Sequence, residues 1–407
     1  MRTLIVTSSL PYPPASGGAL RAYGIIQGLA HAGHDLTLLS FHDGTPDPTQ
    51  TPLAHLCRAI VTVPSPPPRH HTQRLRDLLL SNRADIACRL YSPVFEARLA
   101  ELLRQPYDLI QFEGIEIGLY MPQARRAAPQ AQIIFDTFNA EADLQAMMAR
   151  IERAQPVRWP AALYSWIQAQ RIVNYEGALC RMADGVIAVS VEDQTVLRAY
   201  RNDGKTFVLP SGIFVQDYQA KEHAQLPAHA LVFTGKMDYR PNVDAMLWFH
   251  KTILPRLPQA HLVIVGQKPT PRLQTLAQRG RVSLTGWVDS VTPYLRAAQV
   301  YVAPLRMGSG TRLKLLEAMA CGCAIVATST AASGLSEQAR AAMLLADDAC
   351  SFAQAVQSLL DNPERRAALG QQARAAVAEA YDWPRLIPRL LAIYAEVQYG
   401  QRRHSSA

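Results

Sequence analysis

The sequence predicts two doubly wound α/β domains, each a parallel sheet with helices on both faces. The chain has 407 residues, which is enough for two domains of ordinary size. Its composition, with 49% apolar and 18% charged residues, is that of a globular protein. Short apolar runs alternate with helical segments in two successive series, a pattern typical of parallel strands joined by crossover helices.

The first series defines an expected domain over residues 1–208. A helix is expected from about Gly18 to Ala32, after the first strand and a glycine-containing loop, and another at SPVFEARLAELLR. The expected strands are the apolar runs TLIVTS, DLTLLSF, AIVTV, YDLIQF, AQIIFD and GVIAVS. The stretch that follows, FVLPSGIFVQDY and QAKEHAQLPAH, is expected to link the two domains.

The second series defines an expected domain over residues 225–382. Its strands are expected at ALVFTG, AHLVIVG, RVSLTG, AQVYVAP, CAIVAT and AMLLA. Helices are expected at PNVDAMLWFHKTILPRL and from Thr311 onward. Residues 383–407 are expected to form an amphipathic helix that packs back on the first domain, with the last residues, GQRRHSSA, frayed.

The sequence favours a cytoplasmic protein. The N-terminal MRTLIVTSSLPYPP has too short an apolar run for a signal peptide, and no run approaches the roughly 18 apolar residues of a membrane-spanning helix. The six cysteines are therefore expected to be reduced thiols. Cys321 and Cys323 form a C-x-C pair, but no second pair or histidine cluster completes a metal site, so we expect both to serve packing.

The formal net charge is +8, and the basic excess lies in the second half of the chain. Such an excess can serve an anionic ligand, a nucleic acid or an anionic membrane. The basic residues form no long run and no nucleic-acid motif occurs, so nucleic acid is the least favoured of these partners.

The segment PLRMGSGTRLKLLEAMACG is expected to form a loop and then a helix. That helix starts after Gly310, and Ser309 or Thr311 can cap it. Its first turn carries Arg312 and Lys314, although a helix N-terminus is already the positive end of the helix dipole. A bound anion would explain the two cations. The alternative is that both are solvated and tolerated, at a cost of about 0.3–1 kcal/mol each.

The neighbouring residues suit a phosphate or diphosphate. Gly308 and Gly310 lack side chains, so a ligand can approach the backbone between the strand AQVYVAP and the helix start. Glu317 lies three residues after Lys314. It can form a helix ion pair with that lysine, or accept hydrogen bonds from ribose hydroxyl groups as acids do in nucleotide sites.

Two further loops lie at the ends of expected strands. In FTGKMDYRPN, Gly235 and Lys236 follow a strand and Arg240 precedes the next helix. In PPASGGALRAY, Gly17 and Gly18 lie at the start of a helix, where backbone N–H groups favour anions. Each cation can contact a ligand or remain a solvated surface charge.

Motifs of other enzyme classes do not occur in the chain. It contains no D-x-D, no G-x-S-x-G, no H-E-x-x-H and no C-x-x-C. Hydrolase, metalloprotease and redox activities therefore lose support.

On these residues the chain resembles the retaining glycosyltransferases of family 4, which have the GT-B architecture of two Rossmann-like domains facing a central crevice. GKMDYRPNVDA and GSGTRLKLLEAMA are similar to patterns of a subgroup often associated with bacterial exopolysaccharide gene clusters. PYPPASGG near the start and FNAEADL in the first domain extend the resemblance to nearly the whole chain.

The resemblance implies a nucleotide-sugar donor that is held mainly by the second domain, with no metal required. Lys236 falls where the family places a diphosphate-binding arginine, and Glu317 falls on the second glutamate of an E-x7-E motif that holds the donor ribose. The expected donor-binding residues are Gly17, Gly18, Gly235, Arg240, Gly266, Trp287, Gly308, Ser309, Gly310, Thr311 and Glu317. The expected catalytic residues are Lys236, Arg312, Lys314, Asn139 and Glu141.

Two positions depart from the family pattern. The first glutamate of E-x7-E, which often meets the transferred sugar, would fall on Ser309. Phe138 stands near a site where the family often has a histidine. Asp136, Asn139 and Glu141 remain polar candidates in the first domain, with loop capping and turn formation as the alternative.

The implied reaction moves a sugar from a nucleoside-diphosphate sugar to a glycan or lipid-linked glycan, with retention at the anomeric carbon. Charge on the leaving diphosphate needs lysine, arginine and helix dipoles aimed at it. Two alternatives stay open: a GT-B sugar-nucleotide epimerase, and a non-catalytic nucleotide-sugar-binding partner of a polysaccharide assembly complex. Residues 147–171 combine apolar and arginine side chains, so they can rest on the inner face of an anionic membrane or pack into the core.

Overall fold

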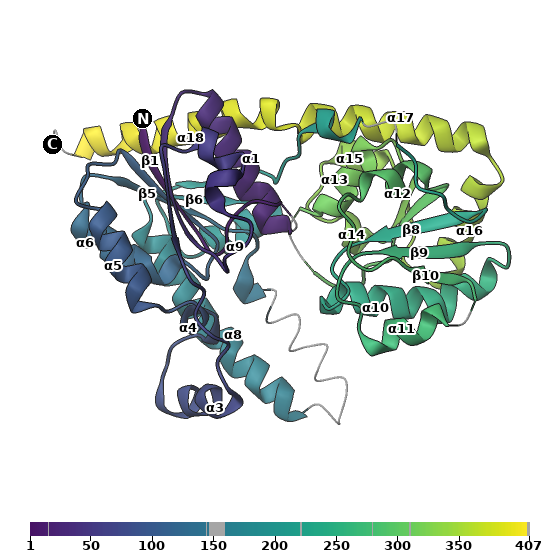
Figure 1. The fold of residues 1–407 in the computed structure, drawn as a ribbon, viewed down its shortest axis with the longest axis horizontal. Helices are drawn as coiled ribbons and strands as arrows, with labels where there is room; N and C mark the ends of the chain where they lie inside the picture. Colours follow the sequence, from purple (N-terminus) through teal and green to yellow (C-terminus); the bar gives the residue numbers. More distant parts are fainter. Residues whose placement is uncertain are drawn as a thin grey trace. The chain divides into compact units, whose positions relative to one another are not determined.

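A computed structural model describes residues 1–14, 16–143, 145, 159–219, 222–278, 280–308 and 311–404. The chain forms two compact units. The first unit consists of Met1–Pro210 and Leu386–Ala407, and the second of Ser211–Arg385. Figure 1 shows both units and labels many of their helices and strands.

The first unit contains a seven-stranded sheet in the order β3-β2-β1-β4-β5-β6-β7, and all neighbouring strands are parallel. The strands are β1 (Arg2–Thr7), β2 (Asp35–Phe41), β3 (Ala59–Val63), β4 (Leu109–Glu113), β5 (Gln132–Asp136), β6 (Gly185–Ala188) and β7 (Thr206–Val208). After β1 the chain adds β2 and then β3 along one edge of β1. It then returns and adds β4 along the opposite edge of β1. The switch point of this doubly wound sheet therefore lies between the carboxyl ends of β1 and β4.

Helices cover both faces of this sheet (Figure 1). The helices of this unit are α1 (Gly17–His31), α2 (Leu53–Leu56), α3 (His71–Leu80), α4 (Asp85–Arg89), α5 (Pro93–Leu102), α6 (Met121–Ala127), α8 (Trp159–Met182), α9 (Val191–Arg198) and, from Leu386 onward, α18 (Trp383–His404). Helix α3 lies away from the sheet (Figure 1). Helix α1 begins because the Ser16 hydroxyl accepts a hydrogen bond from the N–H of Ala19. Its apolar residues Ile25, Ile26 and Leu29 are fully buried and hold the helix in the core.

The second unit contains a six-stranded parallel sheet in the order β10-β9-β8-β11-β12-β13. The strands are β8 (Ala230–Thr234), β9 (His261–Val265), β10 (Val282–Leu284), β11 (Val300–Ala303), β12 (Ile325–Ala327) and β13 (Leu344–Leu345). The helices are α10 (Arg240–Trp248), α11 (Pro271–Ala277), α12 (Thr292–Ala297), α13 (Leu313–Ala320), α14 (Ser329–Ala332), α15 (Glu337–Ala341), α16 (Ala349–Leu360) and α17 (Pro363–Ala380), with a 3₁₀ turn at Val215–Tyr218. By the same argument its switch point lies between β8 and β11.

The predicted fold class of two doubly wound parallel sheets is confirmed. Each strand that the apolar runs predict is present, because strands buried on both faces of a parallel sheet are continuous apolar runs. The sequence interpretation misses β7, which pairs with β6 inside the stretch expected to be a link.

Two helices also differ from expectation. The segment PNVDAMLWFHKTILPRL starts as α10 but continues as a π-helical turn at Phe249–Ile253 and a 3₁₀ turn at Leu254–Arg256. Helix α18 runs on to His404, so the expected fraying is wrong for residues 400–404, while 405–407 lie outside the described residues.

The six cysteines are free thiols, as predicted, and Cys323 is buried. Among the helices in the described parts of the chain, none is long and apolar enough to cross a membrane.

Candidate active site

The second unit places a cluster of charged residues at its switch point, where β8 ends and the segment after β11 leads into α13. Helix α13 begins at Leu313 with Arg312 as its N-cap residue. The expectation that Thr311 caps this helix is therefore wrong, because the chain turns tightly and the N–H of Leu313 bonds the Thr311 carbonyl at 3.1 Å. Ser309 and Gly310 lie outside the described residues.

Lys314 is partly buried in the first turn of α13. Its Nζ donates to Asn242 Oδ1 at 2.5 Å and lies 4.4 Å from the centre of the Phe233 ring. Burial of the ammonium group, and next the nearby Arg312, lower the pKa of Lys314 to about 7, while Glu317 acts in the opposite direction. An anion bound here would raise the pKa of Lys314 again, because an opposite charge favours the charged, protonated form of the amine.

Two glycines let these cations approach the backbone. A Cβ at Gly235, whose φ is +147°, would lie 2.7 Å from Asn242 Nδ2 and 2.9 Å from Lys314 Nζ. A Cβ at Gly308, whose φ is +116°, would lie 2.7 Å from Arg312 Nη2. Glycine adopts these backbone angles without strain, and a side chain at either position would also have to displace the end of a cationic side chain.

Glu317 lies one turn further along α13 and accepts a hydrogen bond from the Tyr218 hydroxyl at 3.1 Å. Burial raises the pKa of Glu317 to about 7, against the opposing effects of Tyr218 and Lys314. The structure thus gives Lys314 and Glu317 separate partners, Asn242 and Tyr218, within a single cluster. A partly buried carboxyl group of this kind is suited to bind a hydroxyl group.

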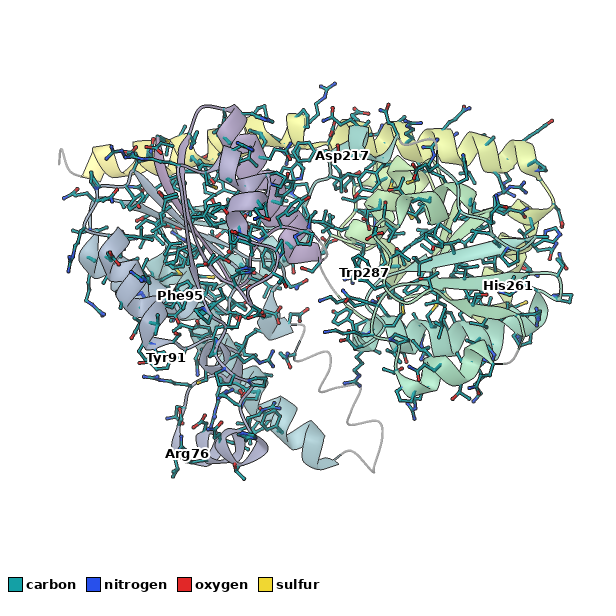
Figure 2. All side chains as sticks on the ribbon, viewed as in Figure 1. Arg76, Tyr91, Phe95, Asp217, His261 and Trp287 are labelled. Carbon is teal, nitrogen blue, oxygen red and sulfur yellow. The ribbon has the colours of Figure 1, made fainter. Side chains whose placement is uncertain are left out.

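The other residues predicted for this site lie around the cluster. Gly266 packs against the backbone of Gly235, since a Cβ there would lie 1.8 Å from the Gly235 carbonyl oxygen. Lys236 is exposed, and Trp287 is 63% exposed after β10 (Figure 2). Arg240 is the first residue of α10 and is half-buried.

Asn242 was missed by the sequence interpretation. The motif FTGKMDYRPN contains this residue. Its role depends on hydrogen bonds that only the structure shows. Its side chain accepts from Lys314 and donates to the carbonyl of Lys236 at 2.9 Å. It therefore ties the loop after β8 to the start of α13.

The first unit has a cavity of about 200 Å³ at its own switch point. Thr7 and Glu113 are register partners at the ends of β1 and β4. Around them the cavity is lined by Ser8, Ser9, Ser16, Gly18, Ala19, Ala22, Glu116 and Phe138. Of the predicted first-domain glycines, Gly18 lines the cavity, while Gly17 is the exposed first residue of α1.

A buried ionic network lies behind this cavity. Arg21 forms a two-oxygen ion pair with Asp136, with N–O distances of 2.8–3.0 Å, and also donates to the Leu209 carbonyl. Gln111 Nε2 donates to Glu113 Oε1 at 2.5 Å. Burial raises the pKa of Asp136 to about 6, while burial and the charge of Asp136 raise the pKa of Glu113 to about 8. Glu113 is thus the carboxyl group that holds a proton at neutral pH.

The polar candidates after β5 have different surroundings. Asp136 is committed to Arg21 and serves the core. The loop containing Asn139 and Glu141 is capped by buried acids, since Asp193 accepts from the N–H of Ala140. The Asn139 amide donates to Glu141 at 3.3 Å. Burial, followed by the charge of Glu116, raises the pKa of Glu141 to about 7.

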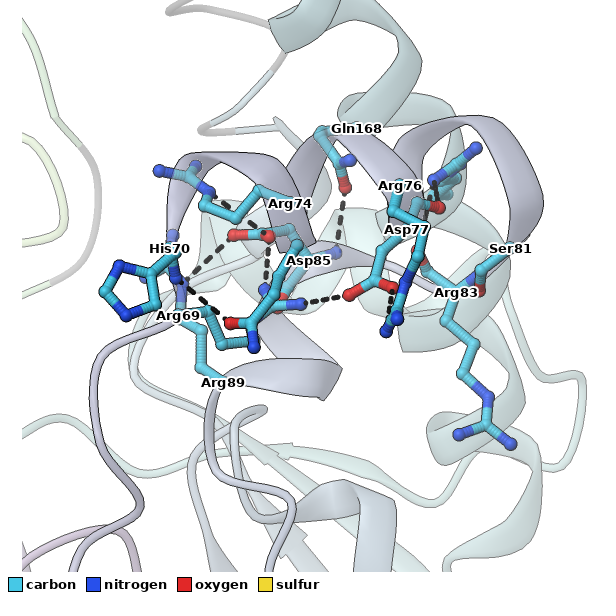
Figure 3. A network of polar contacts seen from close by, with 12 residues as sticks. Arg69, His70, Arg74, Arg76, Asp77, Ser81, Arg83, Asp85, Arg89 and Gln168 are labelled. Atoms are coloured by element: carbon cyan, nitrogen blue, oxygen red, sulfur yellow. Dashed lines mark hydrogen bonds and ion pairs between the residues drawn. The ribbon is translucent and has the colours of Figure 1, made fainter.

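Helices α3, α4 and α8 carry an arginine-rich cluster (Figure 3). Arg69 pairs with Asp77 at 2.9 Å and with Asp85. The two acids are outnumbered by the arginines of this region, which are Arg69, Arg74, Arg76, Arg83, Arg89 and Arg171. Leu80 at the end of α3 is 82% exposed, and Trp166 on α8 is 47% exposed. Of the stretch 147–171, residues 147–158 lie outside the described residues.

Comparisons with known proteins agree with this architecture. A family model described as "Glycosyl transferase 4-like domain" matches residues 16–212, and one described as "Glycosyl transferases group 1" matches residues 228–362. The chain is 27% identical over 222 residues to a phosphatidyl-myo-inositol mannosyltransferase of Mycolicibacterium smegmatis. That match spans 53% of this chain and 51% of the relative, so the chain spans about half the length of this curated relative.

Solved structures share the fold over almost the full length. A sucrose-phosphate synthase from Thermosynechococcus elongatus has a TM-score of 0.74 at 21% identity, covering 98% of this chain and 100% of the other. HepE from Anabaena, in complex with UDP, has a TM-score of 0.65 at 13% identity, covering 97% and 100%. The chain therefore has the GT-B fold. It carries two glycosyl transferase domains, one of them 4-like.

Proposed function

We propose that the protein is a retaining glycosyltransferase that moves a sugar from a nucleoside-diphosphate sugar to a glycan or lipid-linked glycan in bacterial polysaccharide synthesis. The observation that carries this proposal is the cluster at the start of α13. It combines Lys314 with a lowered pKa, Arg312 packed on Gly308, and Glu317 in a single switch point. The Anabaena neighbour was also solved in complex with UDP-glucose, which supports a nucleotide-sugar donor.

The cluster is suited to the chemistry of a leaving diphosphate. Negative charge grows on the diphosphate as the bond to the anomeric carbon breaks. The Lys314 ammonium, the Arg312 guanidinium and the N-terminus of α13 stabilise that charge without a metal ion. In the described residues, no group of three or more histidine, cysteine or acidic side chains is arranged to hold a metal. Glu317 binds the ribose hydroxyl groups in this proposal.

The activity test uses a panel of UDP-, GDP- and ADP-hexoses with glycan acceptors. We expect the protein to release nucleoside diphosphate from one series and to form a product that keeps the anomeric configuration of the donor, as read by NMR. Lys314→Met should lower turnover at least a hundredfold, the loss typical for removal of one charge-stabilising group. Lys251→Met, at an exposed lysine of the same unit, is the matched control and should keep wild-type turnover.

The same panel tests the two alternatives. Conversion of a nucleotide sugar to its epimer without an acceptor would support the epimerase. Nucleotide-sugar binding without any turnover would support the non-catalytic partner of an assembly complex. Neither alternative has a specific observation in its favour.

We also propose that the first unit binds the acceptor and that the protein lies in the cytoplasm, peripheral to the inner face of the membrane. The arginines of α3, α4 and α8, together with exposed Leu80 and Trp166, support an anionic lipid surface as partner. The name of the mannosyltransferase relative, which includes a phosphatidyl lipid, points in the same direction. Flotation with anionic vesicles should recover the protein, and Arg76→Glu should weaken that recovery. Equal recovery with neutral vesicles would contradict this part of the proposal.

A further inference from the structure

We propose that Tyr218 is a positioning residue for Glu317, and that its hydroxyl group sets the preference of the second unit for nucleotides with an intact ribose. This inference deepens the proposed function and rests on it for the role of Glu317. It gives a role to the stretch FVLPSGIFVQDY, which the sequence interpretation treats only as a link.

The first observation is that the two oxygens of the Glu317 carboxyl group have different surroundings. Oε1 accepts a hydrogen bond from the Tyr218 hydroxyl at 3.1 Å. Among the residues that the structure describes, no group donates to Oε2, and this oxygen keeps access to solvent because Glu317 is only partly buried. Oε2 can therefore accept from a ligand hydroxyl group while Tyr218 holds Oε1.

The second observation is that Tyr218 is itself held from several directions. It ends the 3₁₀ turn Val215–Tyr218 and is 9% exposed. Arg296 of α12 donates to its carbonyl oxygen at 3.1 Å. The start of the turn is tied to Asp382, directly before α18, whose Oδ1 accepts from the N–H of Val215 at 3.1 Å. A hydroxyl group fixed in this way gives the carboxyl group of Glu317 a single orientation.

The third observation concerns the charge of Glu317. Burial raises the pKa of Glu317 to about 7, while the hydrogen bond from Tyr218 and then the charge of Lys314 act in the opposite direction. A donor that contacts a carboxyl oxygen favours the carboxylate form. A ribose hydroxyl group that donates to Oε2 needs that form. Tyr218 thus supports ribose binding through both the orientation and the charge of Glu317.

The test measures dissociation constants of the full-length chain by isothermal titration calorimetry at one fixed pH. UDP, GDP and ADP are each compared with their dideoxy analogues, which lack both ribose hydroxyl groups. For the nucleotide that binds, wild type should prefer the ribose form by about tenfold or more, the loss expected when a hydrogen bond to a charged group is not made.

Tyr218→Phe removes the hydroxyl group and keeps the aromatic ring. It should weaken binding of the ribose form about fivefold and leave binding of the dideoxy form within about twofold, so that most of the ribose preference is lost. In the Glu317→Gln background, Tyr218→Phe should not change the ribose preference further, because the carboxylate that it positions is already absent. A purely structural role would weaken both forms of the nucleotide equally.

The matched control is Tyr381→Phe in the same unit. Tyr381 is also buried, and its hydroxyl group accepts from the N–H of Ser336 at 2.6 Å, away from Glu317. This variant loses a buried hydrogen bond as well, yet it should keep the ribose preference of wild type. Thermal melting shows whether each variant folds, and Tyr218→Met, which also lacks the hydroxyl group, repeats the test if Tyr218→Phe does not fold.

Three results would overturn the inference while a nucleotide still binds. These are equal binding of the ribose and dideoxy forms by wild type, a wild-type ribose preference in Tyr218→Phe, and equal weakening of both forms in that variant. Each of them leaves the proposed function standing. If a folded wild type binds no nucleotide at all, the proposed function is refuted, and the inference falls with it.

Discussion

Binding of a nucleoside diphosphate is predicted to move protons at Lys314 and Glu317. Burial and Arg312 lower the pKa of Lys314 to about 7, and burial raises the pKa of Glu317 to about 7. At pH 8 the free Lys314 ammonium is therefore only about one-tenth protonated, and a diphosphate beside it would restore the charged form with uptake of about 0.9 proton. At pH 6 the free Glu317 holds about 0.9 proton, which a ribose hydroxyl donating to its carboxylate would release.

The net exchange therefore changes sign with pH. Lys314 is already protonated at pH 6 and takes up few protons there. Glu317 is already ionised at pH 8 and releases few protons there. We expect a net proton uptake at pH 8 and a net proton release at pH 6, where the terminal phosphate of the nucleotide, with a pKa of about 6, adds to the release from Glu317.

Isothermal titration calorimetry measures this exchange directly. The nucleotide that binds is titrated at each pH in two buffers of different ionisation enthalpy, and the slope of binding enthalpy against buffer enthalpy gives the proton number. Lys314→Met should abolish the uptake at pH 8, and Glu317→Gln should lower the release at pH 6 to the part that comes from the nucleotide phosphate. Lys251→Met is the control and should behave as wild type. Tight binding with no buffer dependence at either pH would refute the reasoning.

Three further predictions concern stability and metal. Gly235→Ala should destabilise the second unit by about 1–3 kcal/mol and weaken nucleotide binding more than tenfold, because its Cβ meets Lys314 and Asn242 at positive φ. Gly280→Ala, also at positive φ but with nothing within 4 Å of the new Cβ, should lose stability in urea yet keep nucleotide affinity. Between about pH 4.5 and 8 native Glu113 holds more protons than the unfolded chain, so wild-type stability should fall relative to Glu113→Gln as the pH rises through this range. Parallel urea curves for the two proteins across this range would refute that. EDTA should leave sugar transfer unchanged, and loss of activity restored by a divalent cation would contradict the metal-independent mechanism.

The fold was predictable because its signals are local. Strands buried on both faces of a parallel sheet appear as apolar runs, and the runs alternate with helical segments. The π-helical turn at Phe249–Ile253 leaves no such pattern, since its form depends on packing against neighbours.

The site was predictable only in part. The sequence places Lys314 and Glu317 near a helix start, but it shows neither their contacts with Asn242, Phe233 and Tyr218 nor the burial that shifts their pKa values. Those contacts join segments far apart in the chain.

The role of Glu113 was even harder to predict from the sequence. The one available signal was a carboxyl group directly after the apolar run YDLIQF. Its meaning depends on the pairing of β1 with β4 and on the commitment of Arg21 to Asp136, and both are long-range features of the fold.

The central claim is that α13 holds the diphosphate of a sugar nucleotide, and a thermal-shift titration with UDP, GDP and ADP tests it most directly. At about 100 times the dissociation constant, a ligand adds about 2.7 kcal/mol of stability, which is a rise of about 5–10 °C for a unit of this size. We predict that one nucleotide produces this rise in wild type and that the double variant Arg312→Ala/Lys314→Ala loses it. If no nucleotide shifts the melting temperature, or the double variant responds as wild type does, the claim is wrong.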